Sequence, residues 1–319
     1  MKYTIIVPFY NAQETLRRCL DSIQKQSYPF FEVLMIDDGS NDNSTEIASA
    51  YTKEDPRFVL IRQPNAGPSK ARNRGIDQAC GTVISFVDSD DSLEPDYLQQ
   101  IDDAFEEDGI QIVFFGVRQF ETSTGKVFVR NVPDFPQRKI DIIVALTQAD
   151  LFGYTWIKAI SRQLIGQTRF NEALDLFEDE VFTCEIVQKC SAISRIAKPL
   201  YNQTISPGSL SRKTHQDYFA KCEAVYIAWR QLMASEQRIN HPILLEKANH
   251  MAMVYKYYFL EKNISPIMFA RGLADCSFFQ DTTTDDALII AIKNKRFVYA
   301  LVKRVIYRMK MVFKKLAGR

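Results

Sequence analysis

The chain has 319 residues, 46% of them hydrophobic and 25% charged, and a formal net charge of +1. This composition is that of a globular protein with a large core, and it excludes a disordered chain and predicts no nucleic-acid partner. The six cysteines form no C-x-x-C pair, which argues against a zinc site and favours a reducing cytosol. No stretch is apolar over the roughly 18 residues of a membrane helix, and we expect no signal peptide.

Short β-rich runs alternate with amphipathic helical patterns over the first 117 residues. The runs are residues 3–7, 31–36, 58–61, 83–87 and 110–117. Such alternation predicts βαβ units, and therefore an α/β fold with a mostly parallel sheet flanked by helices. Ligands in these folds bind beyond the carboxyl ends of the strands. The polar residues that follow the strands are therefore the candidates for function.

The pattern changes after about residue 118. Residues 119–131 predict a hairpin with its turn at 123–125, and 131–138 form a proline-containing loop. Helix-favouring runs from 214 to about 263 predict a helical C-terminal appendage. We therefore divide the chain into a domain of residues 1–212, with halves 1–117 and 118–212, and a helical region of residues 213–319.

The run ISFVDSDDSL places three carboxylates, Asp88, Asp90 and Asp91, directly after an apolar strand. One interpretation is a solvated turn before a helix that Pro95 opens. It does not explain an acid at the very end of the strand. Carboxylates crowded there repel each other unless a cation lies between them, and hard oxygen ligands suit Mg²⁺ or Mn²⁺.

The second acidic pair is Asp37 and Asp38 in MIDDGS. It is typical of an Asx-type turn in which Gly39 takes a positive φ. Alternatively, an ionised carboxylate accepts the ring N–H of uracil, so one of the two acids would select a uridine-type base.

A basic run, NAGPSKARNRG at residues 65–75, follows the third strand. It contains Lys70, Arg72 and Arg74 at a helix start. A solvated basic helix face is the ordinary interpretation of such a run. Because these residues share the strand-end surface with the carboxylates, a contact with a diphosphate is the functional alternative.

Four stretches, VPFYN, IDDGS, NAGPSKARNRG and FVDSDD, resemble the family 2 glycosyltransferases of the Rossmann-like GT-A fold in order and spacing over about ninety residues. The resemblance implies a nucleotide-sugar donor and a divalent cation, Mn²⁺ or Mg²⁺, near Asp90. The residues that it places around the donor are Pro8, Tyr10, Asn11, Asp37, Asp38, Lys70, Arg72, Asp88 and Ser89.

The resemblance also assigns an acidic pair in the second half, found here in LFEDEVF. Asp179 would be the catalytic base, with Glu178 beside it. The same residues also suit the acidic first turn of an amphipathic helix, and both interpretations can hold together. The family usually has a small residue before the pair, whereas this chain has Phe177, which leaves the shape of the acceptor pocket open.

Weaker similarities extend beyond these motifs. YTWIKAISRQLI would bring Trp156 and Lys158 near the acceptor, although Trp156 equally suits a core position. YNQTISPGSLSR resembles a loop that would fold over the donor, with Arg212 in it.

These observations predict an inverting, metal-dependent hexosyltransferase that moves a sugar from a UDP-sugar to a hydroxyl of a saccharide or lipid-linked saccharide in cell-surface glycan synthesis. Receiver domains and D-x-D phosphohydrolases need an acid after the first strand, which here ends without one. A nucleotide-sugar binding module that has lost catalysis is the alternative. The presence of both Asp90 and Asp179 argues against it.

The C-terminal residues from Lys293 to Arg319 are basic, contain no acid and interleave with apolar residues. The pattern suits a helix on an anionic membrane surface, and equally a helix packed on the domain with a solvated basic face. The first interpretation predicts a cytoplasmic protein held peripherally at the cytoplasmic face of the plasma membrane.

Overall fold

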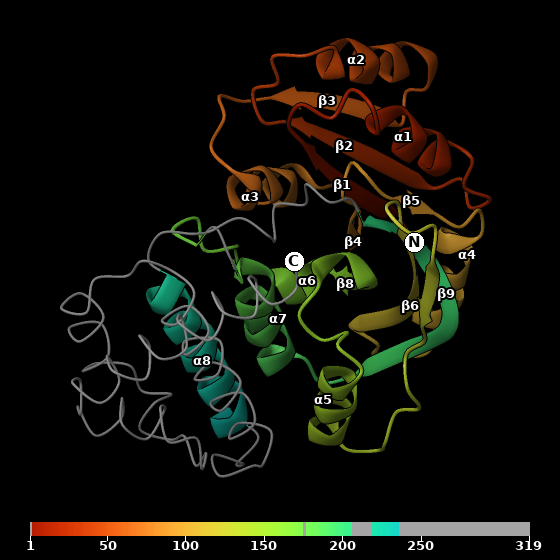
Figure 1. Ribbon diagram of the computed structural model, residues 1–319. Coiled ribbons are helices and arrows are strands. Elements are labelled where there is room, and N and C mark those ends of the chain that lie inside the picture. The colour runs from red at the N-terminus through yellow and green to blue at the C-terminus, as the bar shows by residue number, and fades with distance from the viewer. Residues whose placement is uncertain (1, 175–176, 206–217, 236–319) are drawn as a thin grey trace, which may run out of the picture. The chain divides into compact units, whose positions relative to one another are not determined.

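The computed structural model describes residues 2–174, 177–205 and 218–235. The chain divides into two compact units, Met1–His215 and Gln216–Arg319. Helix α8 (Tyr218–Ser235) is the described part of the second unit (Figure 1). Arg212 and the basic C-terminal segment lie outside the described residues. None of the described helices combines the length and apolar character needed to cross a membrane.

One sheet of nine strands runs through the first unit (Figure 1). Its strands are β1 (Tyr3–Phe9), β2 (Phe31–Asp37), β3 (Phe58–Arg62), β4 (Val83–Phe86), β5 (Ser92–Leu93), β6 (Ile112–Glu121), β7 (Val127–Arg130), β8 (Lys158–Ser161) and β9 (Ile193–Ile205). Their order is β3-β2-β1-β4-β8-β6-β9-β5, and β7 pairs with β6.

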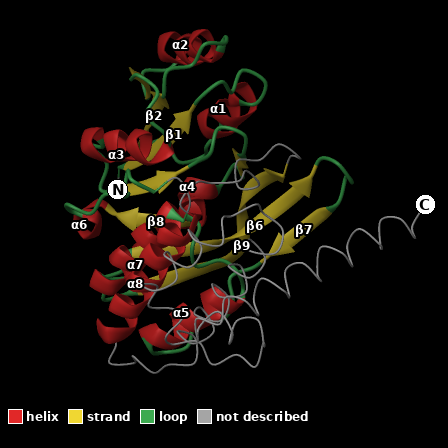
Figure 2. Ribbon diagram, turned by 60° about the vertical axis from the view of Figure 1, so that its left-hand side comes forward, coloured by secondary structure: helices red, strands yellow, loops and turns green. Residues whose placement is uncertain are grey.

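Helices connect these strands and cover the sheet. They are α1 (Leu16–Gln24), α2 (Ser44–Glu54), α3 (Pro68–Gln78), α4 (Tyr97–Phe105), α5 (Lys139–Gln148), α6 (Arg162–Ile165) and α7 (Glu178–Lys189), with the 3-10 turn η1 (Thr155–Ile157). Figure 2 shows α1 and α3 on opposite sides of the strands that they connect. This placement follows from right-handed crossovers that run in opposite directions along the sheet, from β1 to β2 through α1 and from β3 to β4 through α3.

The predicted parallel alternation is confirmed for β1 to β4, whose three pairs are all parallel. Beyond β4 the sheet becomes mixed. The antiparallel strand β8 separates β4 from β6, and β9 pairs in parallel with β6. The predicted hairpin is formed by β6 and β7, with Gly125 at φ 68° in its turn. Strands β8 and β9 were not predicted, because their partners come from distant parts of the chain.

Helix α3 packs so closely on β1 that position 75 has no room for a side chain. A Cβ at Gly75 would lie 2.5 Å from Cγ2 of Ile6, which is itself fully buried. Ile6 is β-branched, so its Cγ2 moves only with the strand backbone or through a change of rotamer. The glycine therefore sets the distance between α3, which carries the basic run, and the sheet.

Lys158, at the start of β8, is 1% exposed. Its Nζ donates to the carbonyl oxygens of Phe152, at 3.2 Å, and of Tyr154, and to Oγ1 of Thr183 at 3.0 Å. These bonds tie β8 and the preceding loop to α7. Burial lowers the pKa of Lys158 to about 7.

We expect Gly75→Ala to destabilise the first unit. Overpacking of a core costs about 1–3 kcal/mol, of which better helix propensity returns about 1 kcal/mol. Urea unfolding followed by circular dichroism measures the net loss. Arg74→Ala, on the exposed side of the same helix, is the control and should leave the free energy of unfolding nearly unchanged. Equal stability of the Gly75 variant and the wild type would show that α3 moves freely away from β1.

Lys158 should give the stability a pH dependence that Lys158→Met removes. Its folded pKa lies below the value of about 10.4 in an unfolded chain, so between pH 7 and 10 the unfolded state binds more protons. The wild-type free energy of unfolding should therefore rise with pH relative to the variant, by up to about 1.4 kcal/mol per pH unit. Urea titrations at pH 7, 8 and 9 measure this difference. A constant difference would contradict the lowered pKa.

Candidate active site

The carboxyl ends of β1, β2 and β4 meet at one edge of the sheet. Phe9 lies beside Asp37 in the register of β1 and β2, and the N–H of Asp38 donates to the carbonyl of Phe9 at 2.9 Å. The N–H of Val87 donates to the carbonyl of Ile6 at 3.0 Å, which brings the end of β4 to the same edge. The segments after these strands are therefore neighbours, as the parallel arrangement predicts.

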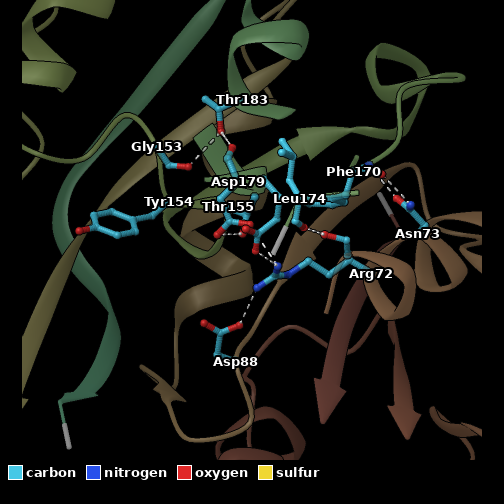
Figure 3. Close-up of polar contacts among 12 residues, drawn as sticks. Arg72, Asn73, Asp88, Gly153, Tyr154, Thr155, Phe170, Leu174, Asp179 and Thr183 are labelled. Carbon is cyan, nitrogen blue, oxygen red and sulfur yellow. Dashed lines mark hydrogen bonds and ion pairs between the residues drawn. The ribbon is translucent and has the colours of Figure 1, made fainter. Parts of the chain in front are cut away.

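Arg72, from α3, joins this edge to the acidic pair of the second half. Its side chain is 7% exposed, and Nη2 lies 3.4 Å from Oδ1 of Asp88. Nη1 lies 3.1 Å from Oε1 of Glu178 and 3.1 Å from Oδ1 of Asp179 (Figure 3). The guanidinium carbon also stands 5.4 Å from the ring centroid of Phe170. One buried cation thus holds Glu178, which is 106 residues from it in sequence, and the adjacent Asp179 beside the end of β4.

This cluster has an excess of negative charge. When all three carboxylates are ionised, one guanidinium faces three acids. Burial, together with repulsion from Asp179, raises the pKa of Asp88 and of Glu178 against the opposing effect of Arg72. Nε of Arg72 has no hydrogen-bond partner among the described residues. The cluster is therefore suited to take up a proton or a further positive charge.

Asp179 lies in the first turn of α7 and is held on both sides. The hydroxyl of Thr155 donates to its Oδ2 at 3.2 Å, and Arg72 lies at its Oδ1. The Thr183 hydroxyl donates to the backbone carbonyl of Asp179 at 2.7 Å (Figure 3). Phe177 precedes the helix in the left-handed region, at φ 64°, a conformation that favours glycine. Glycine, which has no Cβ, would relieve this strain.

Asp37 and Asp38 are both buried and bound by the protein itself. Asp37 accepts from the N–H of Ser40 at 2.9 Å and from Thr45 Oγ1 at 2.6 Å. Gly39 has φ 79°, as an Asx-type turn requires. The selection of a uracil ring by either acid stays a prediction.

Three protein donors converge on Asp38. They are Gln63 Nε2 at 2.7 Å and the N–H groups of Ala66 and Gly67 at 2.9 and 2.8 Å. These occupy three of the roughly four lone-pair positions of a carboxylate. Asp38 therefore shapes the loop that leads into α3 and so places Arg72.

The acids after β4 differ sharply in their surroundings. Asp91 is 2% exposed and accepts hydrogen bonds on both oxygens, from the Tyr201 hydroxyl and from the N–H of Thr204, each at 2.8 Å. Asp90 is exposed, and the backbone hydrogen bond to its carboxylate comes from its own N–H. Of the two, Asp90 is the acid that is available to a ligand.

The donor set fits a divalent cation that is shared with a ligand. No three His, Cys, Asp or Glu side chains of the described residues form a metal cage. Asp90 is exposed and Asp88, at the same strand end, is half-buried, and both offer hard oxygen atoms. Mg²⁺ and similar ions are commonly held by one or two carboxylates together with substrate phosphates. The residues present match that arrangement.

The remaining donor-side candidates surround this edge. Tyr10 is 48% exposed, and the side-chain oxygen of Asn11 accepts from the N–H of Asn41 at 2.8 Å. Pro8 and Ser89 are half-buried. Lys70 is exposed in the first turn of α3, so its ammonium group is available to an anion.

Trp156 and Lys158, expected near the acceptor, are both buried. The Trp156 ring stacks between Tyr154, at a centroid distance of 4.9 Å, and Tyr201, at 4.7 Å. The burial and stacking of Trp156 fit the alternative interpretation, in which it is a core aromatic residue. Thr155, Thr183 and Tyr201 were not predicted as parts of the site, because single hydroxyls carry no recognisable spacing.

Comparison with known proteins agrees with this geometry. The family model described as Glycosyl transferase family 2 matches residues 4–165. The glycosyltransferase EpsH of Bacillus subtilis is 31% identical over 70% of this chain and 66% of its own length. Glycosyltransferase GlyA of Streptococcus pneumoniae is 33% identical over 66% of this chain and 32% of its own. The chain thus spans less than two thirds of these relatives.

The crystal structure of residues 1–349 of Staphylococcus aureus TarS, in complex with UDP-GlcNAc, matches with a TM-score of 0.74. The two are 22% identical, and the match covers 97% of this chain and 92% of the other. At this identity the likeness establishes the fold. The family model and the relatives also establish the family. The chain belongs to glycosyl transferase family 2, with the GT-A fold that its motifs predict.

Proposed function

We propose that this glycosyltransferase inverts the anomeric carbon of a UDP-sugar and transfers a hexosyl group to a hydroxyl of a saccharide or lipid-linked saccharide. The observation that carries the proposal is the joining of Asp88 and Asp179 through Arg72. It brings a donor-side acid and a candidate base to one place. The TarS structures in complex with UDP-GlcNAc and with UDP support a uridine nucleotide as part of the donor.

Asp179 is the proposed general base. The Thr155 hydroxyl donates to its Oδ2, and Arg72 forms an ion pair with its Oδ1, so both oxygens of the carboxylate are held in place. As the acceptor oxygen bonds to the anomeric carbon, its proton passes to Asp179 and the sugar–phosphate bond breaks. A single base and direct displacement invert the configuration, and no carboxylate nucleophile is required.

Charge on the departing diphosphate is the second demand of the reaction. Asp90 and Asp88 would hold the divalent cation, which when bound acts as a Lewis acid toward the diphosphate. Lys70 lies exposed at the start of α3 and adds a positive charge at the same edge. A structure described as the mannosyltransferase PcManGT with GDP-Man and Mn²⁺ matches with a TM-score of 0.52, which supports a metal of this kind.

The proposal also covers the acceptor and the place in the cell where the enzyme acts. TarS is named a poly(ribitol-phosphate) N-acetylglucosaminyltransferase and is 28% identical over 63% of this chain, which supports a cell-surface glycan as acceptor. The basic segment from Lys293 supports peripheral attachment at the cytoplasmic face of the membrane. Vesicle sedimentation with and without anionic lipid tests that attachment.

Asp179→Asn should abolish transfer while donor binding persists. Loss of a general base costs about 10²–10⁴-fold in rate. A screen of UDP-hexoses against saccharide acceptors, followed by UDP release, measures the rate, and calorimetry with UDP and Mn²⁺ measures binding. Glu180→Gln, one residue further along α7, is the control and should keep most of the activity. Full transfer by the Asp179 variant would remove this residue from the mechanism.

Asp90→Asn should weaken the Mn²⁺-dependent binding of UDP tenfold or more, because the amide replaces a charged ligand of the cation. Binding of UDP without metal should stay nearly unchanged. Asp96→Asn, whose acid forms a surface ion pair with Lys198, is the control for charge loss nearby. The same Mn²⁺ enhancement in the Asp90 variant as in the wild type would exclude Asp90 as a metal ligand.

A further inference from the structure

The turn that carries Asp88 and Asp90 is tied to β9 through a single hydroxyl group. The backbone N–H of Asp88 donates to the Tyr201 hydroxyl oxygen at 3.0 Å. The same hydroxyl donates its own hydrogen to Oδ2 of Asp91 at 2.8 Å. Tyr201 is fully buried, so water does not substitute for either bond. One side chain thus binds both the first and the last acid of the turn.

Further bonds complete this attachment. The N–H of Thr204 donates to Oδ1 of Asp91 at 2.8 Å, and the N–H of Asp91 closes the turn on the carbonyl of Asp88 at 3.1 Å. From α1, Arg18 Nη2 donates to the carbonyl of Asp90 and to Thr204 Oγ1. The turn is therefore held by its backbone and by Asp91. The carboxylates of Asp88 and Asp90 take no part in this attachment.

The Tyr201 ring is fixed independently of its hydroxyl. It stacks on Trp156 with the ring planes 24° apart, and Trp156 stacks in turn on Tyr154. A phenylalanine at position 201 keeps this stack and loses only the oxygen. It would leave the N–H of Asp88 and Oδ2 of Asp91 without this partner. Removing the hydroxyl therefore tests the attachment without removing the ring.

We infer that Tyr201 is a positioning residue for donor binding, whose hydroxyl sets the direction in which Asp88 and Asp90 present their carboxylates. The inference rests on the proposed function, which gives these two acids their roles at the donor and the metal. Tyr201 acts through the turn and does not touch the donor. Removal of the Tyr201 hydroxyl should therefore weaken metal-dependent binding of the donor more than a loss of stability alone would.

The chain offers a matched control in Tyr3. This tyrosine is also fully buried, and its hydroxyl donates to Oδ1 of Asp102 at the same distance, 2.8 Å. It stands at the amino end of β1, whereas the candidate site lies at the carboxyl end. Tyr3→Phe and Tyr201→Phe each remove one tyrosine–aspartate hydrogen bond, which is part-buried at Tyr3 and buried at Tyr201. A purely structural role predicts loss of stability in both and altered ligand binding in neither.

Calorimetric titration with UDP, at saturating Mn²⁺, compares the wild type with both variants, and thermal unfolding reports their stability. We expect the Kd for UDP to rise about tenfold or more in Tyr201→Phe and less than twofold in Tyr3→Phe. Should Tyr201→Phe fail to fold, Asp91→Asn provides the second test. Its amide presents one oxygen where the carboxylate presents two, so one of the bonds to Tyr201 and Thr204 is lost and the Kd should rise likewise.

The outcomes distinguish a failure of the proposed function from a failure of the positioning role alone. A wild-type chain that does not bind UDP with Mn²⁺ overturns the proposed function, and this inference with it. A wild type that binds, with unchanged Kd in the folded Tyr201 and Asp91 variants, overturns the positioning role alone. A higher Kd in Tyr201→Phe but not in Tyr3→Phe, at similar losses of melting temperature, supports it.

Discussion

The candidate site depends on one buried guanidinium surrounded by acids. Arg72 reaches Asp88 from the donor half and Glu178 with Asp179 from the second half, and no other described ion pair connects these acids. Removing Arg72, the cation of this buried cluster, would leave its acids uncompensated, at a cost of about 3–5 kcal/mol. This cost makes the ion-pair cluster a strong constraint on where α7 lies against the end of β4.

The surroundings divide the acids of the strand ends into two groups. Asp37, Asp38 and Asp91 are buried and bound by protein donors, so they shape the turns that carry other residues. Asp90 is exposed, and the backbone hydrogen bond to its carboxylate comes from its own N–H. The first group holds the turns in place, and Asp90 stays available to a ligand. A site that must receive a charged ligand needs both, because free carboxylates keep their geometry only when the backbone beneath them is fixed.

Much of the first half follows from local pattern. The runs that become β1 to β4 are continuous and apolar, and the helices between them are amphipathic, so periodicity alone predicts their pairing in parallel. Strands β8 and β9 were missed because their pairing partners are distant in sequence, and their short or mixed runs carry no strong periodicity. Tyr201, which bonds to the turn of Asp88 and Asp91, lies in β9. Because β9 was not predicted, the attachment of this turn could not be predicted either.

The sequence by itself determined the family, the α/β class and the identity of the acids, because these depend on residue types at short spacing. It placed Asp88, Asp90 and Asp179 among the candidates from motifs alone. It took the fold to bring three protein donors to Asp38, to bury Lys158 and Trp156, and to join the two halves through Arg72. The physical reason is that burial and hydrogen bonding are properties of neighbours, and the neighbours of these side chains lie up to about a hundred residues away along the chain.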